Sequence, residues 1–424
     1  MAVHVVTAGE SLWTISTFYG VSVETIVELN GLPSATSIVP GLALYLPDTL
    51  LSKRSYRIKA RDNIWQLAQH FKTTITSILS ANPGLDPNRL IIGQVLNIPT
   101  QLTLEIATLG FLVPSSKSAN VMTLNALAGH LTYVAVVAYA FTEEGYAFNQ
   151  VDDTEIVTRC KEMGIVPLLM IRNYTGNEFS ADLAGKVLGN PVYRTNLIAS
   201  IVNLTIQRKF GGVSIDFEFI PPARRNDFNI FLTELKLALG DHILHVNVHA
   251  KIADIPTNRI IGAYDYAAIG KVADIMAVMT IDYGYPGGPP DPIAPINWME
   301  QVIQYSLTQL GSAKLQIAMP LYGYDKVVPT NRTRALSVLA AQNQAISTGS
   351  IIDFDAVSQS PWFRYYQGAE EHIVWFEDIR SFIEKYRLID MYQLAGTTFW
   401  QISLPAPQNW AYVMKNISVL KKGL

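Results

Sequence analysis

The sequence predicts an α/β protein in which a (β/α)8 barrel, the TIM barrel, follows two small βααβ domains. Three observations support this prediction. The chain has 424 residues, which is too long for one ordinary domain. Its first hundred residues repeat themselves at an offset of 52 positions without a gap. From about residue 105 onward, eight short apolar segments alternate with amphipathic stretches, as in a barrel of parallel strands.

The repeat indicates two copies of a strand, two helices and a closing strand. Matching positions include Ala8 and Ala60, Asn30 and Asn82, and Gly41 and Gly93. The predicted elements are 3–7, 12–19, 23–29 and 43–46 in the first copy, and 56–59, 64–71, 75–81 and 95–98 in the second. Ser22 and Thr74 stand where helix N-caps belong. Trp13 and Trp65 are expected to pack in the two cores, since both fall on the apolar side of the first helix.

Both copies resemble the LysM module. The pattern is carried by Gly9-Glu10-Ser11-Leu12-Trp13, by Asn30 and by the closing Leu46-Pro47, and the second copy departs from it at Arg61-Asp62-Asn63-Ile64. The resemblance implies binding of glycans that contain N-acetylglucosamine, such as peptidoglycan or chitin, between two loops. The implied glycan-binding residues are Gly9, Glu10, Ser11 and Leu12, facing 31–34, and Arg61, Asp62, Asn63 and Ile64, facing 83–86.

We place the domains at 1–48, 54–100 and 105–424. The connectors 49–53 and 101–104 are short, so the modules are expected to lie close together. We also expect the barrel to fold without them. The predicted barrel strands are 106–112, 133–140, 166–171, 212–217, 244–249, 275–280, 315–320 and 396–400. Active sites in this fold lie at the C-terminal ends of the strands.

The fourth barrel strand holds the main candidate for chemistry. Val213, Ile215 and Phe217 alternate with Ser214, Asp216 and Glu218, and a polar face in a buried strand is costly unless it lines a site. Asp216 and Glu218 rise on the same face, roughly 6–7 Å apart. The charge of Asp216 is expected to keep a proton on Glu218, as a general acid requires. A solvated edge strand is the alternative, but glycine and proline pairs bound this run as in a buried parallel strand.

This strand resembles the D-G-x-D-x-D-x-E signature of glycoside hydrolase family 18. Met279-Thr-Ile-Asp282, Pro320-Leu-Tyr322-Gly323 and the closing Trp400 resemble further motifs of that family, in the same order. The resemblance implies substrate-assisted cleavage that retains the anomeric configuration, because Asp216 can hardly reach the sugar face opposite Glu218. It implies catalytic roles for Glu218, Asp216 and Asp282. It also implies sugar contacts by Ser214, Met279, Tyr283, Tyr322 and Trp400, although Tyr322 and Trp400 could instead fill the barrel core.

Three residues depart from the family pattern. Gly211 and Ser214 replace the two outer aspartates of the signature, and Ile281 replaces a tyrosine that contacts the acetamido group. Tyr283 or Tyr285 are candidates to replace that tyrosine. The run 284–295, rich in glycine and proline, is predicted to form a loop that rims the site.

Tandem LysM copies before such a barrel resemble the spore cortex-lytic N-acetylglucosaminidases of endospore formers, as do Gly284-Tyr285 and Val374-Trp-Phe-Glu-Asp378. This implies a peptidoglycan hydrolase that acts after N-acetylglucosamine in spore cortex during germination and resides in the spore coat or cortex or at the cell wall. A chitinase and a lectin-like glycan-binding protein of low activity are the alternatives. We expect a monomer without a cofactor.

Composition excludes several other classes. The net charge of −3 argues against nucleic-acid binding, and no run of eighteen apolar residues predicts a membrane span. The N-terminus lacks the pattern of a Sec signal peptide. The single cysteine, Cys160, allows no internal disulfide and is expected to be a structural thiol. His245 and His249 share a strand face, but no third ligand at a telling spacing supports a metal site.

Overall fold

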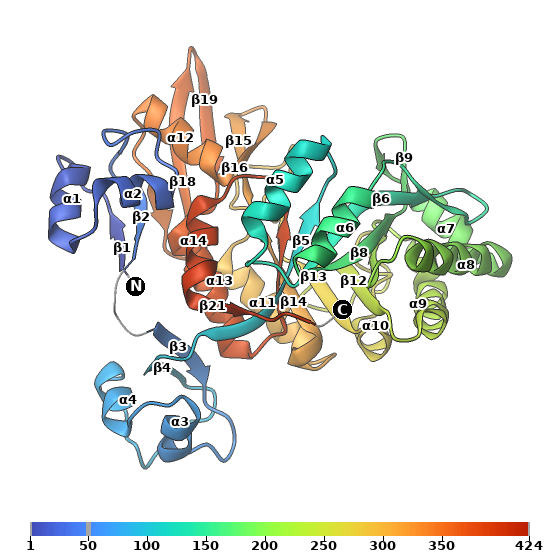
Figure 1. Cartoon of the computed structure of the whole chain (residues 1–424), viewed down its shortest axis with the longest axis horizontal. Coiled ribbons are helices and arrows are strands. Elements are labelled where there is room, and N and C mark those ends of the chain that lie inside the picture. Colours follow the sequence, from blue (N-terminus) through green and yellow to red (C-terminus); the bar gives the residue numbers. More distant parts are fainter. Residues whose placement is uncertain (1, 48–51, 423–424) are drawn as a thin grey trace.

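The computed structural model describes residues 2–47 and 52–422 and places two small modules beside a larger barrel domain (Figure 1). In each module two helices pack on a pair of antiparallel strands. The elements of the first module are β1 (Ala2–Val5), α1 (Leu12–Tyr19), α2 (Val23–Asn30) and β2 (Ala43–Leu46). Those of the second are β3 (Ser52–Arg57), α3 (Ile64–His70), α4 (Ile75–Ala81) and β4 (Val95–Thr100). The predicted βααβ order is confirmed.

Helix starts in the modules follow the predicted caps. The side chains of Ser22 and Thr74 accept hydrogen bonds from the backbone N–H groups of Thr25 and Ser77, so both are N-caps. The prediction for the two tryptophans is wrong, because Trp13 and Trp65 are 70% and 61% exposed. The neighbouring Leu12 and Ile64 point into the cores, and a step of one residue turns the side chain by about 100° around the helix.

Parallel strands close the predicted barrel. Among the described residues its eight strands run in chain order around the barrel, and the last pairs with the first. They are β5 (Leu104–Leu112), β6 (Tyr133–Phe141), β8 (Val166–Arg172), β11 (Gly212–Asp216), β12 (Ile243–His249), β13 (Ile275–Met279), β14 (Leu315–Pro320) and β20 (Gly396–Trp400). Small additional strands are β7 (Ala147–Asn149), β9 (Tyr174–Thr175), β10 (Glu178–Phe179) and β21 (Ile417–Val419), of which β21 pairs with β5.

Amphipathic helices cover the barrel and bury its outward side chains. Phe217, for example, stacks on Phe231 with ring centroids 5.5 Å apart. Cys160 is buried on one of these helices, as expected of a structural thiol. The helices are α5 (Lys117–Leu127), α6 (Thr154–Glu162), α7 (Ala181–Gly189), α8 (Pro191–Gln207), α9 (Arg225–Leu239), α10 (Tyr266–Val272), α11 (Ile296–Leu307), α13 (Ile379–Tyr392) and α14 (Pro407–Asn416). Within the described ranges, no helix has the length and apolarity needed to cross a membrane.

An inserted subdomain between β14 and β20 was not predicted from the sequence. It consists of an antiparallel sheet with the order β16-β15-β19-β18-β17 and one helix. Its elements are β15 (Tyr322–Val328), β16 (Arg332–Ser337), α12 (Val338–Thr348), β17 (Asp353–Asp355), β18 (Ser360–Gln367) and β19 (Glu370–Trp375). Strand β15 begins two residues after β14 ends, so the insertion stands directly on the C-terminal end of the barrel.

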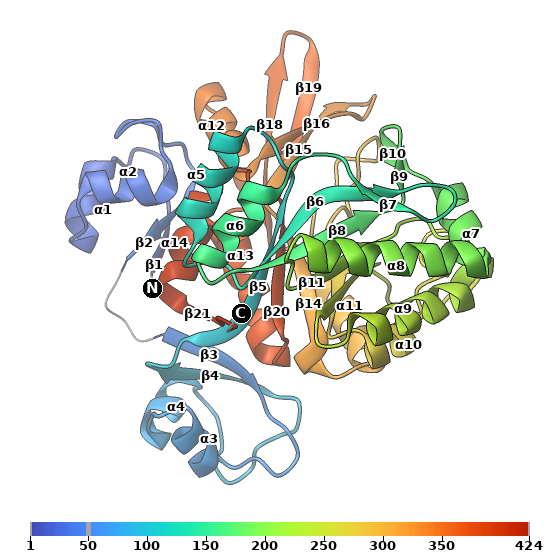
Figure 2. The same ribbon diagram turned by 45° about the vertical axis from the view of Figure 1, so that its right-hand side comes forward.

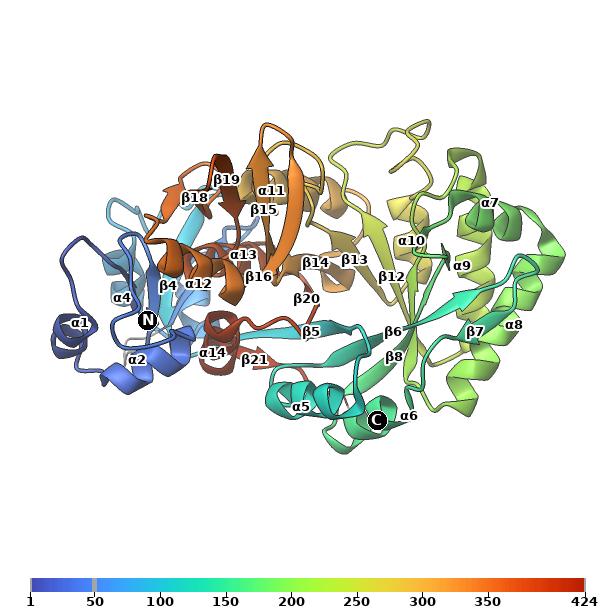
Figure 3. The same ribbon diagram turned by 90° about the horizontal axis from the view of Figure 1, so that it is seen from above.

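Module 1, residues 2–47 of the structure, is docked firmly on this insertion and on α14 (Figures 1 and 3). One continuous hydrophobic core contains Leu12, Ile26 and Leu44 of the module together with Ile352 and Phe363 of the insertion. Polar contacts complete the junction, because Gln342 donates to the backbone carbonyl of Asn30 at 2.9 Å and Gln408 donates to its side-chain oxygen at 2.9 Å.

Module 2, residues 54–100, contacts the barrel domain through β3, while α3 and α4 lie on the far side (Figure 2). Arg54 makes a bidentate ion pair with Asp390 of α13, with N–O distances of 2.8 and 2.7 Å. Arg57 donates to Tyr392 at 3.0 Å and lies 3.2 Å from Glu300. This junction is mainly polar, unlike that of module 1.

Candidate active site

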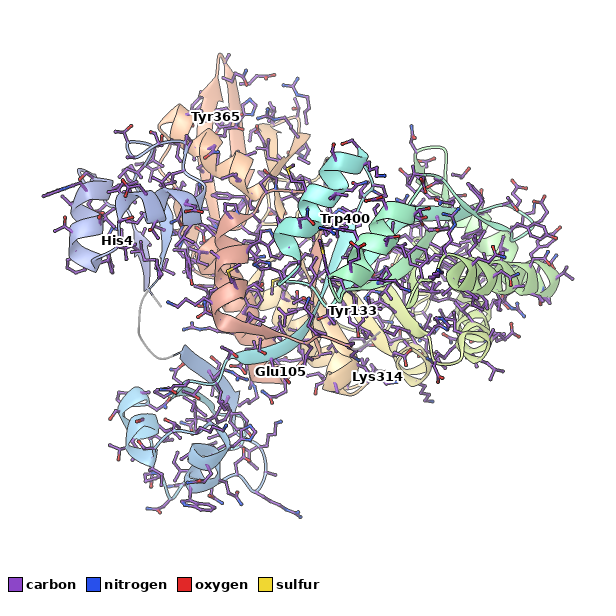
Figure 4. The ribbon with its side chains drawn as sticks, in the orientation of Figure 1. His4, Glu105, Tyr133, Lys314, Tyr365 and Trp400 are labelled. Carbon is purple, nitrogen blue, oxygen red and sulfur yellow. The ribbon has the colours of Figure 1, made fainter. Side chains whose placement is uncertain are left out.

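The C-terminal end of β11 carries both predicted catalytic carboxyls. Asp216 ends the strand and is 5% exposed, and the Glu218 side chain lies just beyond it and is 17% exposed. In Figure 4, Trp400 at the end of β20 marks this end of the barrel, whereas Lys314 lies at the opposite end. Glycine is required at 212, because a Cβ there would lie 2.3 Å from the carbonyl oxygen of Ile243. The strands therefore pack closely below the carboxyls.

The backbone around Glu218 is held by two side chains, one directly after β8 and one in the segment before α10. The backbone N–H of Glu218 donates to the side-chain oxygen of Asn173 at 2.8 Å, and the amide nitrogen of Asn173 donates to the carbonyl of Glu218 at 2.8 Å. Tyr264 donates its hydroxyl to the carbonyl of Phe217 at 2.7 Å. Asn173 and Tyr264 are fully buried. These bonds fix the position from which the Glu218 side chain projects.

Arg172 stands beside Asp216, because the two residues are paired in register on β8 and β11. Burial is the main cause that raises the pKa of Asp216 well above its ordinary value, and the nearby charge of Glu218 adds to it. The guanidinium of Arg172 acts in the opposite direction and favours the ionised carboxylate. Arg172 was not predicted from the sequence, although an arginine that ends an apolar barrel strand at the catalytic end is itself a signal.

A neutral layer lies directly below Asp216. The hydroxyl of Ser214 is 2.9 Å from Nδ1 of His245 and accepts a hydrogen bond from Asn247 at 3.2 Å. Burial lowers the pKa of His245 to about 3, so this imidazole is uncharged at neutral pH. Ser214 is fully buried. Where the family signature has acidic side chains, this chain has an uncharged network.

His249 is the nearest basic neighbour of Glu218 from the next strand. Its Nε2 lies 3.3 Å from a carboxylate oxygen of Glu218, and its ring packs against Phe219 and Tyr264. His245 contacts Ser214 in the layer below, so the two histidines of β12 have different neighbours at different depths of the barrel. Within residues 2–47 and 52–422, no group of three His, Cys, Asp or Glu side chains could hold a metal ion.

Asp282 follows β13 with a left-handed backbone (φ 56°) and accepts two hydrogen bonds from tyrosines. The hydroxyls of Tyr322 and Tyr324 donate to its Oδ1 at 2.6 and 2.7 Å. The residue is exposed as a whole, but the protein around its carboxyl displaces water, which raises the pKa of Asp282, while the two tyrosines oppose that shift. Tyr324 was not predicted. It becomes recognisable only once β15 is known to continue from the seventh barrel strand.

The other predicted sugar contacts lie around this group. Met279 ends β13, and Trp400 ends β20 with its ring 5.4 Å from that of Phe111. Tyr283 and Tyr285 are both exposed, and the ring of Tyr283 packs on Trp298 at 5.3 Å. The loop that follows is pinned to the insertion, because Lys326 donates to the carbonyls of Tyr285, Gly288 and Pro289. Trp375 donates to the carbonyl of Pro290 at 2.7 Å.

Several of the predicted glycan-binding residues of the modules have side chains that are buried or that form hydrogen bonds within their own module. Leu12 and Ile64 are buried in the cores, so only their backbone atoms could meet a glycan. Ser11 and Asn63 cap α1 and α3. The carboxylate of Glu10 accepts from Thr7 and lies 3.0 Å from His4, and Asp62 accepts from Tyr56 and Lys59. Gly9 and Arg61 share left-handed backbone, and Arg61 is exposed.

Comparison with known proteins agrees with this arrangement. The chain is 35% identical over 411 residues to YdhD of Bacillus subtilis (strain 168), named as a candidate sporulation-specific glycosylase, covering 95% of this chain and 96% of that protein. It is 29% identical to the cortical fragment-lytic enzyme of Bacillus anthracis, over 99% of both. The crystal structure of the spore cortex-lytic enzyme SleL of Bacillus cereus matches with a TM-score of 0.87 and 28% identity, covering 100% of this chain and 99% of that one.

Family models assign both parts of the chain. The LysM domain model matches residues 4–47 and 56–99. The model for glycosyl hydrolases family 18 matches residues 175–404, a range that includes Asp216, Glu218 and Asp282 as well as the insertion. With more than half of its residues matched by that model, this chain belongs to glycosyl hydrolases family 18.

Proposed function

We propose that this protein is a peptidoglycan hydrolase, an N-acetylglucosaminidase that cleaves after N-acetylglucosamine in spore cortex peptidoglycan or its fragments. The observation that carries the proposal is the pair Asp216 and Glu218 on one strand end, with the backbone of Glu218 clamped by Asn173. A fixed carboxyl at the open end of a barrel is suited to proton transfer. Asp282, Tyr322 and Tyr324 form a second polar group on the neighbouring strands.

The placement of the carboxyls favours substrate-assisted cleavage. Asp216 and Glu218 project from the same strand, so Asp216 cannot attack the sugar face opposite the acid. In our mechanism the acetamido oxygen of the N-acetylglucosamine attacks C1 of the same sugar while Glu218 gives its proton to the glycosidic oxygen. The bond between C1 and that oxygen breaks, the other sugar leaves with a hydroxyl group, and an oxazolinium ion forms. Asp216 accepts the acetamido N–H and stabilises the positive charge. Glu218 then takes a proton from a water molecule, which attacks C1. This attack opens the oxazolinium ring and restores the starting configuration at C1.

Substrate class and location are inferred from the relatives and the modules. Two of the similar proteins are named as cortical fragment-lytic or spore cortex-lytic enzymes, and they match along the whole chain. LysM modules are associated with glycans that contain N-acetylglucosamine, which, together with the names of these relatives, supports a location at the spore or the cell wall. We therefore propose a role in cortex degradation during germination, with peptidoglycan as the partner and the monomer as the working form.

One observation favours a weaker enzyme or a lectin. The two outer aspartates of the family signature are absent, and a neutral layer of Ser214, His245 and Asn247 replaces them. Without those carboxylates, Arg172 and Glu218 are the charged neighbours that act on Asp216, in addition to its burial. Retention of Glu218 nevertheless favours catalysis over simple binding.

Product analysis tests the proposed function. Purified protein is incubated with spore cortex, vegetative peptidoglycan and chitin oligomers, and mass spectrometry identifies the new reducing ends. We expect products that end in N-acetylglucosamine, released fastest from cortex material, and no products from the Glu218→Gln variant, which cannot donate the proton. Faster turnover of chitin would identify a chitinase, and no turnover of any substrate would identify a lectin. Hydrolysis by Glu218→Gln at the wild-type rate would remove Glu218 from the mechanism.

A further inference from the structure

The two LysM modules have opposite charge. Residues 1–48 contain no lysine or arginine, and their four acidic residues give a formal charge of −4. Residues 54–100 contain six basic and two acidic residues, which gives a formal charge of +4. Two copies of one fold that carry charges of opposite sign are not interchangeable for a charged ligand.

They also differ in how they meet the barrel domain. In module 1 the first residue of the loop 31–34 packs closely on the barrel domain. A Cβ on Gly31 would lie 2.7 Å from the side chain of Pro407 and 2.8 Å from that of Leu339. The corresponding loop of module 2 is open, since Pro83, at the position equivalent to Gly31, is exposed, and a Cβ on the next residue, Gly84, would meet nothing within 4 Å.

The asparagines at matching positions show the same difference. Asn30 and Asn82 make the same hydrogen bonds to the backbone within their modules. Asn30 also accepts hydrogen bonds from Gln342 and Gln408 of the barrel domain. Asn82 is partly exposed, whereas Asn30 is fully buried. The C-terminal end of α2 in module 1 is therefore part of the junction with the barrel domain.

The basic residues of module 2 divide into two groups. Arg54 and Arg57 are used in the junction with α13 and its neighbours. Lys59, Arg61 and Arg89 are exposed and flank the two loops, 61–64 and 83–86, where the glycan is expected. The nearby acidic groups, Asp62 and Asp86, already accept local backbone hydrogen bonds. The edge of the predicted groove is thus positively charged.

We propose that module 2 anchors the protein to carboxylate-bearing glycan strands, whereas module 1 serves as a structural part of the barrel domain. Peptidoglycan carries carboxylates on its muramic acid and on its peptides, while chitin is neutral. Arg61 and Arg89 would pair with such carboxylates beside the sugar that lies in the groove. This inference rests on the glycan binding proposed above, but it is independent of any catalytic step.

Binding isotherms of the full chain on insoluble polymers test this division. The variant Arg61→Gly/Arg89→Ser gives module 2 smaller neutral side chains, and glycine suits the left-handed backbone at 61. We expect its affinity for purified peptidoglycan to fall about tenfold at low salt, as for two lost ion pairs, and its affinity for chitin to fall clearly less, because neutral chitin forms no ion pair with Arg61 or Arg89. The wild-type affinity for peptidoglycan should fall with rising salt.

A matched control places the same change of charge in module 1. Thr7→Glu/Thr36→Glu also shifts the formal charge by two units in the negative direction, here by adding two carboxylates beside the corresponding loops of that module, and both residues are exposed. We expect this variant to bind peptidoglycan like the wild type. Equal losses in both double variants, or equal losses on peptidoglycan and chitin, would overturn the proposal. Thermal unfolding of each variant verifies that the modules are intact, and hydrolysis of soluble fragments, measured separately, tests the proposed function itself.

Discussion

At the scale of single residues, the two carboxyls at the end of β11 meet very different surroundings. Asp216 is buried, with Arg172 beside it and a neutral hydroxyl below it. Glu218 is partly exposed and lies 3.3 Å from His249. Burial opposes ionisation of Asp216, whereas Arg172 favours the ionised form that would bind a substrate N–H. A more exposed carboxyl on a clamped backbone suits a group that exchanges protons with substrate and water.

Asp216→Asn is expected to slow hydrolysis and to stabilise the fold. The folded chain raises the pKa of Asp216, so ionising this group above that pKa costs folding free energy, and the substitution removes the cost. We expect a melting temperature about 1–3 °C above the wild type at pH 8, with the difference vanishing as the pH falls towards about 4. The rate should fall about a hundredfold. A lower melting temperature at pH 8 would refute the assigned pKa shift.

Arg172→Gln is expected to move the acid limb of the pH profile of kcat/KM to higher pH. The guanidinium favours the ionised form of Asp216, so its removal raises the pKa of that carboxyl and lowers the ionised fraction at a given pH. Arg172→Lys keeps the charge and should largely restore the position of the limb. A lower rate with an unchanged limb would assign Arg172 a structural role only.

At this scale the signature of the fourth barrel strand predicted Asp216 and Glu218, and the Met279–Asp282 motif predicted Asp282, but neither predicted their neighbours. Asn173 and Arg172 follow from the register of β8 against β11, and Tyr264 comes from the segment before α10. Register between distant strands leaves no pattern in a single sequence, so these contacts required the structure. The exposed tryptophans show a different limit, because one helical position separates the inward face from the outward one.

At the scale of elements, a buried lysine is one of the side chains that hold the loop 284–291. Lys326 is 1% exposed and donates to three loop carbonyls. Lys326→Met is expected to cost about 2 kcal/mol of stability, since it leaves those carbonyls without their donor. It should also raise KM about fivefold with a smaller effect on kcat, because the loop carries the exposed Tyr285.

Lys314→Met is the control for that loop. Lys314 also donates to backbone carbonyls, those of Gly270 and Ala273, but at the opposite end of the barrel (Figure 4). We expect it to lower the unfolding temperature without changing KM. An equal rise of KM in both variants would show that the loop has no specific part in substrate binding.

Most elements could be predicted from the sequence, because their periodicity is local. The eight apolar barrel strands and the four module helices lie within about two residues of the predicted positions. The insertion was missed, since the charged and polar positions of β16 and β18 give no continuous apolar run. Its sheet is stabilised by contacts with module 1, which lies more than 270 residues earlier in the chain.

At the scale of the whole molecule, module 1 and the insertion share one hydrophobic core, so removing module 1 is expected to destabilise the barrel domain. The expectation that the barrel folds without the modules stays a prediction. Removing module 1 would expose Ile352, Phe363 and Val374 to water. The measurements proposed above therefore use the full chain with point substitutions.

A pair of matched glycines tests this junction. Gly41 and Gly93 occupy equivalent positions with φ of 84° and 87°, so alanine brings similar backbone strain to both. A Cβ at 41 would lie 1.9 Å from the carbonyl oxygen of Ile352, whereas a Cβ at 93 would meet nothing within 4 Å. Gly41→Ala should therefore destabilise the protein by about 2 kcal/mol more than Gly93→Ala does. Equal effects in thermal unfolding would contradict a tight junction.

The most direct test of the proposed mechanism is the anomeric form of the first product. Proton NMR follows the hydrolysis of a β-linked cortex fragment by the wild-type chain and records the new reducing end before it equilibrates. Because Asp216 ends β11 and Glu218 follows two residues later, the acetamido oxygen is left as the nucleophile, and we predict that the β-anomer of N-acetylglucosamine appears first. Initial release of the α-anomer would show direct attack by water and would contradict substrate-assisted cleavage.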